Sequence, residues 1–274
     1  MRLFVLALLL MSSRVWAQGP PYQTDDPVPV EYGHFEFYVF GNADGTPKET
    51  DSSGPAIEFN WGAIPRIQLH VVVPLGSIHP ADEPSAFGLV DAETGIKWAW
   101  IREGKYVPQI GTFPMFELPL GDSSKGLGIG KVWYRVPVWA QKNIGPWTLD
   151  GGAGETFVPQ EGYRNFPYGG FLLKREIVQN KLELGGEIFA HGAEGEAAPQ
   201  ERASTMIDVG GYYHFKSPDH QLLFCYGHSV AGMTENYGYL GLYWTWGTDK
   251  AKGGADRPLA FAPPRLPSGG LTTF

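Results

Sequence analysis

Along most of the chain, apolar and polar residues alternate with a period of two. In the clearest stretch, Ile57, Phe59 and Trp61 share one face of an extended segment, and Glu58 and Asn60 share the other. Successive side chains of a β-strand point to opposite faces, so this pattern predicts strands with one apolar and one polar face. The alternation predicts twelve strands, at 32–40, 55–62, 66–74, 88–101, 107–118, 127–139, 147–157, 167–178, 181–190, 204–216, 220–230 and 236–246.

The connections between these predicted strands alternate in length. Longer ones are expected at 41–54, 75–87, 119–126, 158–166, 191–203 and 231–235, and shorter ones at 63–65, 102–106, 140–146, 179–180 and 217–219. A membrane barrel has an even number of strands, short turns at one end and longer loops at the other. The fold class predicted is all-β, an up-and-down antiparallel transmembrane β-barrel of about 12 strands.

The first 17 residues carry a targeting signal. Arg2 is followed by an unbroken apolar run from Leu3 to Met11, and Ala17 ends a segment typical of secretory signal peptides. Cleavage near Ala17 predicts export, and the barrel pattern predicts the bacterial outer membrane. We therefore expect a signal peptide at 1–17, a periplasmic lead segment and candidate plug at 18–30, an outer-membrane β-barrel at 31–246 and a flexible tail at 247–274.

Composition excludes several other classes of protein. The 274 residues include 37 Gly and 23 Pro, which argues against a helix bundle because these are the poorest helix formers. The formal net charge of −8 argues against nucleic-acid binding by phosphate neutralisation. Cys225 is the only cysteine, which excludes an intrachain disulfide framework.

The polar positions of the predicted strands are candidates for lining the barrel interior. A Lys or Arg that faces lipid at mid-depth costs about 2–4 kcal/mol, so charged side chains should point inward. The lumen-lining candidates are Glu58, His70, Asp91, Glu93, Lys97, Glu117, Lys174, Glu183, Glu187, Asp208 and His214. Asp91 and Glu93 lie two apart on one face, which suits either acid–base chemistry or, as we prefer, a charged wall.

Tryptophans gather near the predicted short turns. An indole is favoured at the boundary between lipid and water, so a ring of them at one end indicates an aromatic girdle. The girdle candidates are Trp61, Trp98, Trp100, Trp139, Trp147, Trp244 and Trp246. In a soluble sandwich, the alternative fold, tryptophans would spread through the core between two sheets.

Short motifs give no support for catalysis. Gly126 to Lys131 lacks the Ser or Thr and the helix of a phosphate loop, and Gly227-His228-Ser229 lacks the final Gly of a nucleophile elbow. The seven histidines form no H-x-H or H-x-x-x-H pair of the kind that binds metals. The sequence therefore predicts no enzymatic activity, no catalytic residue, no metal site and no cofactor.

Several segments resemble a known bacterial family. They are TDDP at 24–27, EYGHFEFYVF at 31–40, FNWGAIPRIQLHVVVPLG at 59–76, the D-x-E-x-G-x-K strand at 91–97, GKVWYRVPVWAQKNIGPWT at 131–148 and LELGGEIF at 182–189. In order and spacing the chain is similar to the outer-membrane β-barrel family named for the meta-pathway of phenol degradation. The resemblance implies an outer-membrane barrel and the passage of small aromatic or hydrophobic compounds.

These observations together favour an outer-membrane channel or transporter for passive passage of small, aromatic or hydrophobic solutes. Alternatives are a structural or lipid-modifying barrel, and a soluble periplasmic β-sandwich that binds carbohydrate. The expected partners are outer-membrane lipid, a small-molecule solute and the barrel-assembly machinery, with no nucleic acid. The sequence leaves the oligomeric state open.

Overall fold

A computed structural model describes residues 21–194, 203–216 and 219–247. The predicted signal peptide, residues 18–20 of the lead segment and the tail beyond 247 lie outside these residues. The strands are β1 (His34–Gly45), β2 (Glu49–Ile64), β3 (Ile67–Pro80), β4 (Ala86–Leu89), β5 (Ala92–Ile101), β6 (Gln109–Thr112), β7 (Met115–Leu118), β8 (Trp133–Ile144), β9 (Trp147–Phe157), β10 (Phe166–Val178), β11 (Leu182–His191), β12 (Ser204–His214), β13 (His220–Gly232) and β14 (Asn236–Gly247).

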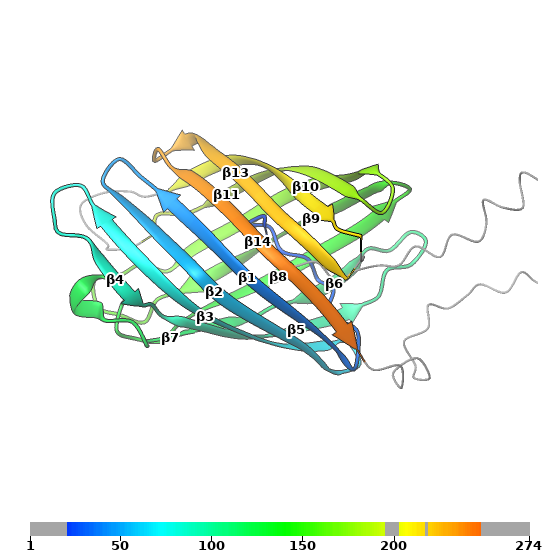
Figure 1. The fold of residues 1–274 in the computed structure, drawn as a ribbon, viewed down its shortest axis with the longest axis horizontal. Helices are drawn as coiled ribbons and strands as arrows, with labels where there is room; N and C mark the ends of the chain where they lie inside the picture. The colour runs from blue at the N-terminus through cyan, green and yellow to red at the C-terminus, as the bar shows by residue number, and fades with distance from the viewer. Residues whose placement is uncertain (1–20, 195–202, 217–218, 248–274) are drawn as a thin grey trace, which may run out of the picture.

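These strands form one closed antiparallel barrel (Figure 1). The first strand pairs with the last, from His34↔Gly247 to Gly45↔Asn236, and β3 pairs with β5. Two of the crossings are interrupted, one between β4 and β5 and one between β6 and β7, so 14 elements make a barrel of 12 strands. The fold class predicted from the alternation is confirmed. Because the described strands belong to a single closed sheet, the sandwich alternative is wrong.

The two faces of the sheet have opposite chemistry. On β3, Leu69, Val71 and Val73 are exposed on the outer face, whereas Gln68 and His70 are buried inside the barrel. The apolar outer positions have no protein covering them, which is the arrangement of a strand whose outer side chains touch lipid. The inner positions carry the polar side chains that the alternation assigned to the interior.

The two ends of the barrel differ. We call the end with residues 34 and 247 the terminal end and the other the loop end; in Figure 1 they lie to the right and left respectively. The connections at the loop end are 46–48, 81–85, 119–132, 158–165, 192–203 and 233–235, and the third contains the 3-10 helix η2 (Ser123–Lys125). Among the described residues, no helix has the length and apolar character needed to cross a membrane.

The predicted alternation of connection lengths is only partly right. The connections expected at 41–54 and 231–235 shrink to three residues each, because β1, β2 and β13 continue further than predicted. The strand predicted at 127–139 is β8, which begins later, at Trp133, and ends at Ile144. The connection before it is therefore longer than predicted. Strand ends that project past the lipid carry polar side chains on both faces, so their sequence resembles that of a loop.

The lead segment runs through the interior. Pro21, Tyr22, Thr24, Asp26 and Val30 are buried, and the dark blue chain lies within the ring of strands in Figure 1. The segment leaves the lumen at the terminal end, where Gly33 donates a backbone hydrogen bond to Gly62 and β1 begins. The interior is therefore occupied by the chain's own residues as well as by the inward side chains.

Candidate functional site: the occupied barrel lumen

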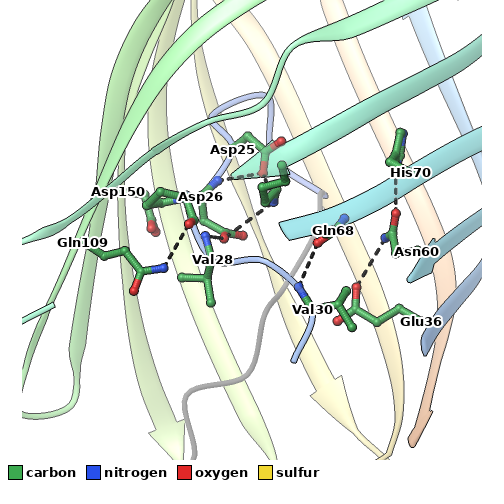
Figure 2. Close-up of polar contacts among 12 residues, drawn as sticks. Asp25, Asp26, Val28, Val30, Glu36, Asn60, Gln68, His70, Gln109 and Asp150 are labelled. Atoms are coloured by element: carbon green, nitrogen blue, oxygen red, sulfur yellow. Dashed lines mark hydrogen bonds and ion pairs between the residues drawn. The ribbon is translucent and has the colours of Figure 1, made fainter. Parts of the chain in front are cut away.

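Lys97 is the centre of one set of contacts that hold the lead segment. Its Nζ lies 2.9 Å from Asp25 Oδ1 and 3.6 Å from Asp26 Oδ1, and all three side chains are largely buried. The ammonium also sits 4.8 Å from the centre of the Phe113 ring. A buried cation needs nearby opposite charge, and here β5 supplies the lysine. The lead segment supplies both carboxylates, Asp25 and Asp26, which are labelled in Figure 2.

Glu187, on the other side of the barrel, binds the backbone of the same segment. Its carboxylate accepts hydrogen bonds from the backbone N–H of Gln23, at 3.0 Å, and of Thr24. The Gln23 side chain donates to Asp208 Oδ2 at 3.4 Å. Peptide N–H groups have no strand partner inside a lumen, so an inward carboxylate satisfies them.

Three further hydrogen bonds complete the attachment. Val30 N donates to Gln68 Oε1 at 2.9 Å, and Gln109 Nε2 donates to the carbonyl oxygen of Pro27 at 2.9 Å (Figure 2). Tyr237 donates through its hydroxyl to the carbonyl oxygen of Pro21 at 3.2 Å. The anchoring side chains come from β3, β5 and β6 and from β11, β12 and β14, so the segment spans the lumen.

Two inward glycines leave room for this segment. A Cβ on Gly170 would lie 2.0 Å from Thr24 Oγ1. A Cβ on Gly62 would lie 2.1 Å from the Glu31 carbonyl oxygen, which is a backbone atom and cannot rotate aside. The barrel wall at these points therefore fits a chain that lies directly against it.

A second polar network covers the wall formed by β2, β3, β5, β7 and β8. Asn60 donates to Glu58 at 2.8 Å, and its carbonyl oxygen lies 2.6 Å from Nδ1 of His70. The other ring nitrogen of His70 lies 2.8 Å from Glu93 Oε1. Arg135 pairs with Glu93 and reaches a second carboxylate, Glu117, at 3.5 Å. Glu93, one of the two carboxylates considered for acid–base chemistry, therefore sits inside a network of structural ion pairs.

The structure places the eleven lumen candidates as follows. Six are buried inside the barrel: Glu58, His70, Lys97, Lys174, Glu187 and Asp208. The remaining five are half-buried: Asp91, Glu93, Glu117, Glu183 and His214.

Asp91 is set apart from the other candidates, because it lies in the interruption between β4 and β5. Its carboxylate accepts a hydrogen bond from the backbone N–H of Gly121 at 3.0 Å and so holds the 119–132 connection. Asp91 and Glu93 therefore do not act as a pair: Glu93 is bound to His70 and Arg135 instead.

Residues that the sequence did not single out complete the interior. Glu36 accepts hydrogen bonds from Tyr38 and Tyr243 and from the side chain of Asn60. The signal for Glu36 was available, since it shares a face with Tyr38 in the alternating strand 32–40. No periodicity marked Asp25 or Asp26, because the lead segment has no regular structure.

Most of the tryptophans predicted for the aromatic girdle lie on the outer face of the barrel. Trp61, Trp98, Trp100, Trp147 and Trp246 are exposed on the outside, Trp244 is half-buried, and Phe35 stacks on both Trp61 and Trp246.

Trp139 is a wrong girdle assignment: it is 1% exposed and points into the lumen. Strand β8 continues to Ile144, so Trp139 lies in the middle of the strand rather than at its end. Its indole covers Gly152 on the neighbouring strand, where a Cβ would come within 2.5 Å of the ring.

Several solved outer-membrane proteins have a similar fold. An outer membrane channel from Pseudomonas putida F1 matches 81% of this chain and 98% of its own, with 13% identity and a TM-score of 0.68. The fold is that of an outer-membrane β-barrel. Two further structures share this fold. The translocator domain of the autotransporter NalP from Neisseria meningitidis matches 77% of this chain and 88% of its own, with 9% identity and a TM-score of 0.53. The NanC porin matches 76% of this chain and 98% of its own, with 8% identity and a TM-score of 0.51. No protein-family model matches the chain, and no curated protein matches it.

The expectation that the protein has no enzymatic activity needs correction. Proteins that share a barrel differ in what they do, so this fold does not support a conclusion that catalysis is absent.

Proposed function

We propose that this protein is an outer-membrane channel for passive passage of small solutes, in which residues 21–30 restrict the lumen. The observation that carries the proposal is the closed barrel with an apolar outer face and a charged interior that contains the lead segment. Such an outer face suits lipid contact, and such an interior suits a polar path. We place the barrel in the outer membrane after cleavage near Ala17, with insertion by the barrel-assembly machinery.

Aromatic side chains in the lumen support small aromatic or hydrophobic solutes as the first class to test. One buried cluster contains Tyr38, Tyr212, Tyr239 and Tyr243, and Tyr22 of the lead segment packs against it. When the segment withdraws, Tyr22 leaves a space bordered by tyrosine rings. Such rings offer apolar faces and hydroxyl groups to a ring-shaped solute. The resemblance to the phenol meta-pathway family supports the same solute class.

The test is flux through purified protein in liposomes. We expect swelling in the presence of small solutes, faster for a phenolic compound than for a sugar of similar mass. Empty liposomes and liposomes with heat-unfolded protein are the controls, and a heat-dependent gel shift verifies the folded barrel. A folded, inserted barrel that passes no solute of any size would refute the proposal and favour a structural role.

A further inference from the structure

A second group of ionisable side chains lies at the loop end of the barrel. His191 ends β11, Glu194 follows three residues later, and Glu235 lies in the connection between β13 and β14. One ring nitrogen and one oxygen from each carboxylate all lie within 4.8 Å of one another. The side chains of His191 and Glu235 are each only 10% exposed, so the group is built into the wall.

The His191 ring is held so that one particular nitrogen faces the carboxylates. Its Nδ1 lies 2.8 Å from the carbonyl oxygen of Gly192, which can only accept, so Nδ1 carries the hydrogen. Nε2 is then the ring nitrogen that faces Glu235, 3.4 Å from its Oε2. The Phe166 ring meets the imidazole edge-on, with centroids 6.2 Å apart. A hydrogen bond from the distal nitrogen to a carbonyl is the usual support of a metal-binding histidine.

The spacing fits one metal ion. His191 Nε2 and Glu235 Oε2 are 3.4 Å apart. Zinc binds nitrogen and carboxylate oxygen at about 2.0–2.2 Å, so two ligand atoms on a tetrahedral ion lie roughly 3.4 Å apart. Glu194, at the start of a connection, offers a carboxylate oxygen within 4.8 Å of both of these atoms as the third ligand. One histidine and two carboxylates leave the fourth position for water.

Glu235 is anchored independently of the metal ligands. Its backbone N–H donates to the Ser229 hydroxyl at 2.9 Å, and its carbonyl oxygen accepts from the Ser229 N–H at 3.0 Å. A ligand fixed by its own backbone loses little freedom when it binds an ion. The site would therefore tie the end of β11 to a connection 44 residues further along the chain.

A cavity gives an ion access to this group. It has a volume of ≈ 440 Å³ and is lined by Glu194 and Glu235 together with Asp44, Glu49 and Asp51. Lys48 is the only cationic residue among its described lining residues. The excess of carboxylates attracts cations to the cavity, and the histidine favours a borderline transition-metal ion over Ca²⁺ or Mg²⁺, which prefer oxygen ligands.

We propose that His191, Glu194 and Glu235 form a binding site for a divalent transition-metal ion, with Zn²⁺ the best match, at the loop end of the barrel. The spacing of histidines in the sequence gave no sign of it, because the three ligands come from two connections and a strand end. The site stands independently of the channel function, since it requires only the fold.

The experiment is calorimetric titration of the full chain, folded in detergent and washed with chelator, using ZnCl₂. We expect one zinc ion per chain, with affinity at least tenfold weaker in His191→Ala and in Glu235→Gln. His228→Asn and Glu161→Gln remove a histidine and an exposed carboxylate at the same end, and both should bind zinc as the wild type does. Zinc should also raise the unfolding temperature of the wild type and not that of His191→Ala.

Two results would overturn the site. The first is the absence of stoichiometric zinc binding to a barrel that passes the heat-dependent gel-shift test of folding. The second is zinc binding that His191→Ala leaves unchanged, or CaCl₂ binding of equal affinity, either of which would reduce the group to a non-selective acidic cavity. Because the gel shift reports folding separately, a variant that fails to fold is recognised, and Glu235→Gln, which keeps the side-chain shape, then decides.

Discussion

Replacement of Glu187 by alanine tests directly whether the lead segment closes the lumen. The carboxylate accepts the backbone N–H groups of Gln23 and Thr24, and the Glu187 and Thr24 residues are buried. A hydrogen bond to a charged group contributes about 1.5–3 kcal/mol, and an unsatisfied buried N–H costs a similar amount. Loss of both bonds therefore disfavours the seated segment by roughly 3 kcal/mol or more. That value shifts the balance toward the released segment by about 100-fold.

The measurement is single-channel conductance in planar bilayers, with liposome swelling as a second readout. We expect Glu187→Ala to be open for a far larger fraction of time than the wild type. Glu36→Gln is the matched control, because Glu36 is also buried in the lumen and hydrogen-bonded, but to β1, β2 and β14 side chains. Unchanged open time in a folded Glu187→Ala barrel, or an equal rise in Glu36→Gln, would show that the segment does not control passage.

Two further predictions concern the wall itself. Gly62→Ala places a Cβ against the Glu31 carbonyl oxygen, so we expect residues 30–31 to shift and solute flux to rise in swelling assays. The control is Gly238→Ala, where a Cβ meets nothing within 4 Å. Equal flux through the two variants would contradict the close fit of the lead segment to the wall. Val209→Arg puts a charge on the outer face at the centre of β12, where Val209 is 59% exposed. We expect it to lower the free energy of unfolding in lipid by about 2–4 kcal/mol, whereas Val209→Leu should leave that free energy unchanged. Equal stability of the two variants in a urea titration would argue against lipid contact.

The strand pattern could be predicted because lipid imposes it on every crossing. Wherever the barrel passes through hydrocarbon, backbone groups must pair and one face must be apolar, as Val71 and Val73 show on β3. The constraint ends where the lipid ends. Residues 49–54, ETDSSG, are polar on both faces and still belong to β2. A sequence interpretation based on alternation therefore finds β2 and underestimates its length.

Trp139 shows how one strand boundary changes the interpretation of a side chain. With a strand predicted at 127–139, this indole falls at the strand end, where a girdle is expected. In the structure Val136 and Val138 are exposed, so the parity of the strand turns Trp139 inward. The alternation of Val136 and Val138 with Trp139 is visible in the sequence and predicts the inward position of the indole.

The contacts of the lumen were beyond prediction for a different reason. Lys97 meets Asp25 across 72 positions of the sequence, and Glu187 meets Thr24 across 163. Alternation says that Lys97 and Glu187 face inward, and says nothing about which residue each one meets. Those pairings depend on the radius of the barrel and on the path of a segment that has no periodicity of its own.

Three prolines stiffen the lead segment. Pro21, Pro27 and Pro29 restrict the backbone of residues 21–30, so little conformational entropy is lost when the segment is seated. A modest set of hydrogen bonds and the Lys97 ion pairs can then hold it without a large apolar core. A stiff chain anchored on both sides of the lumen resists local fraying, because release of one anchor leaves the others in place. We infer that the segment moves as a unit, and that a solute passes when several anchors are lost together.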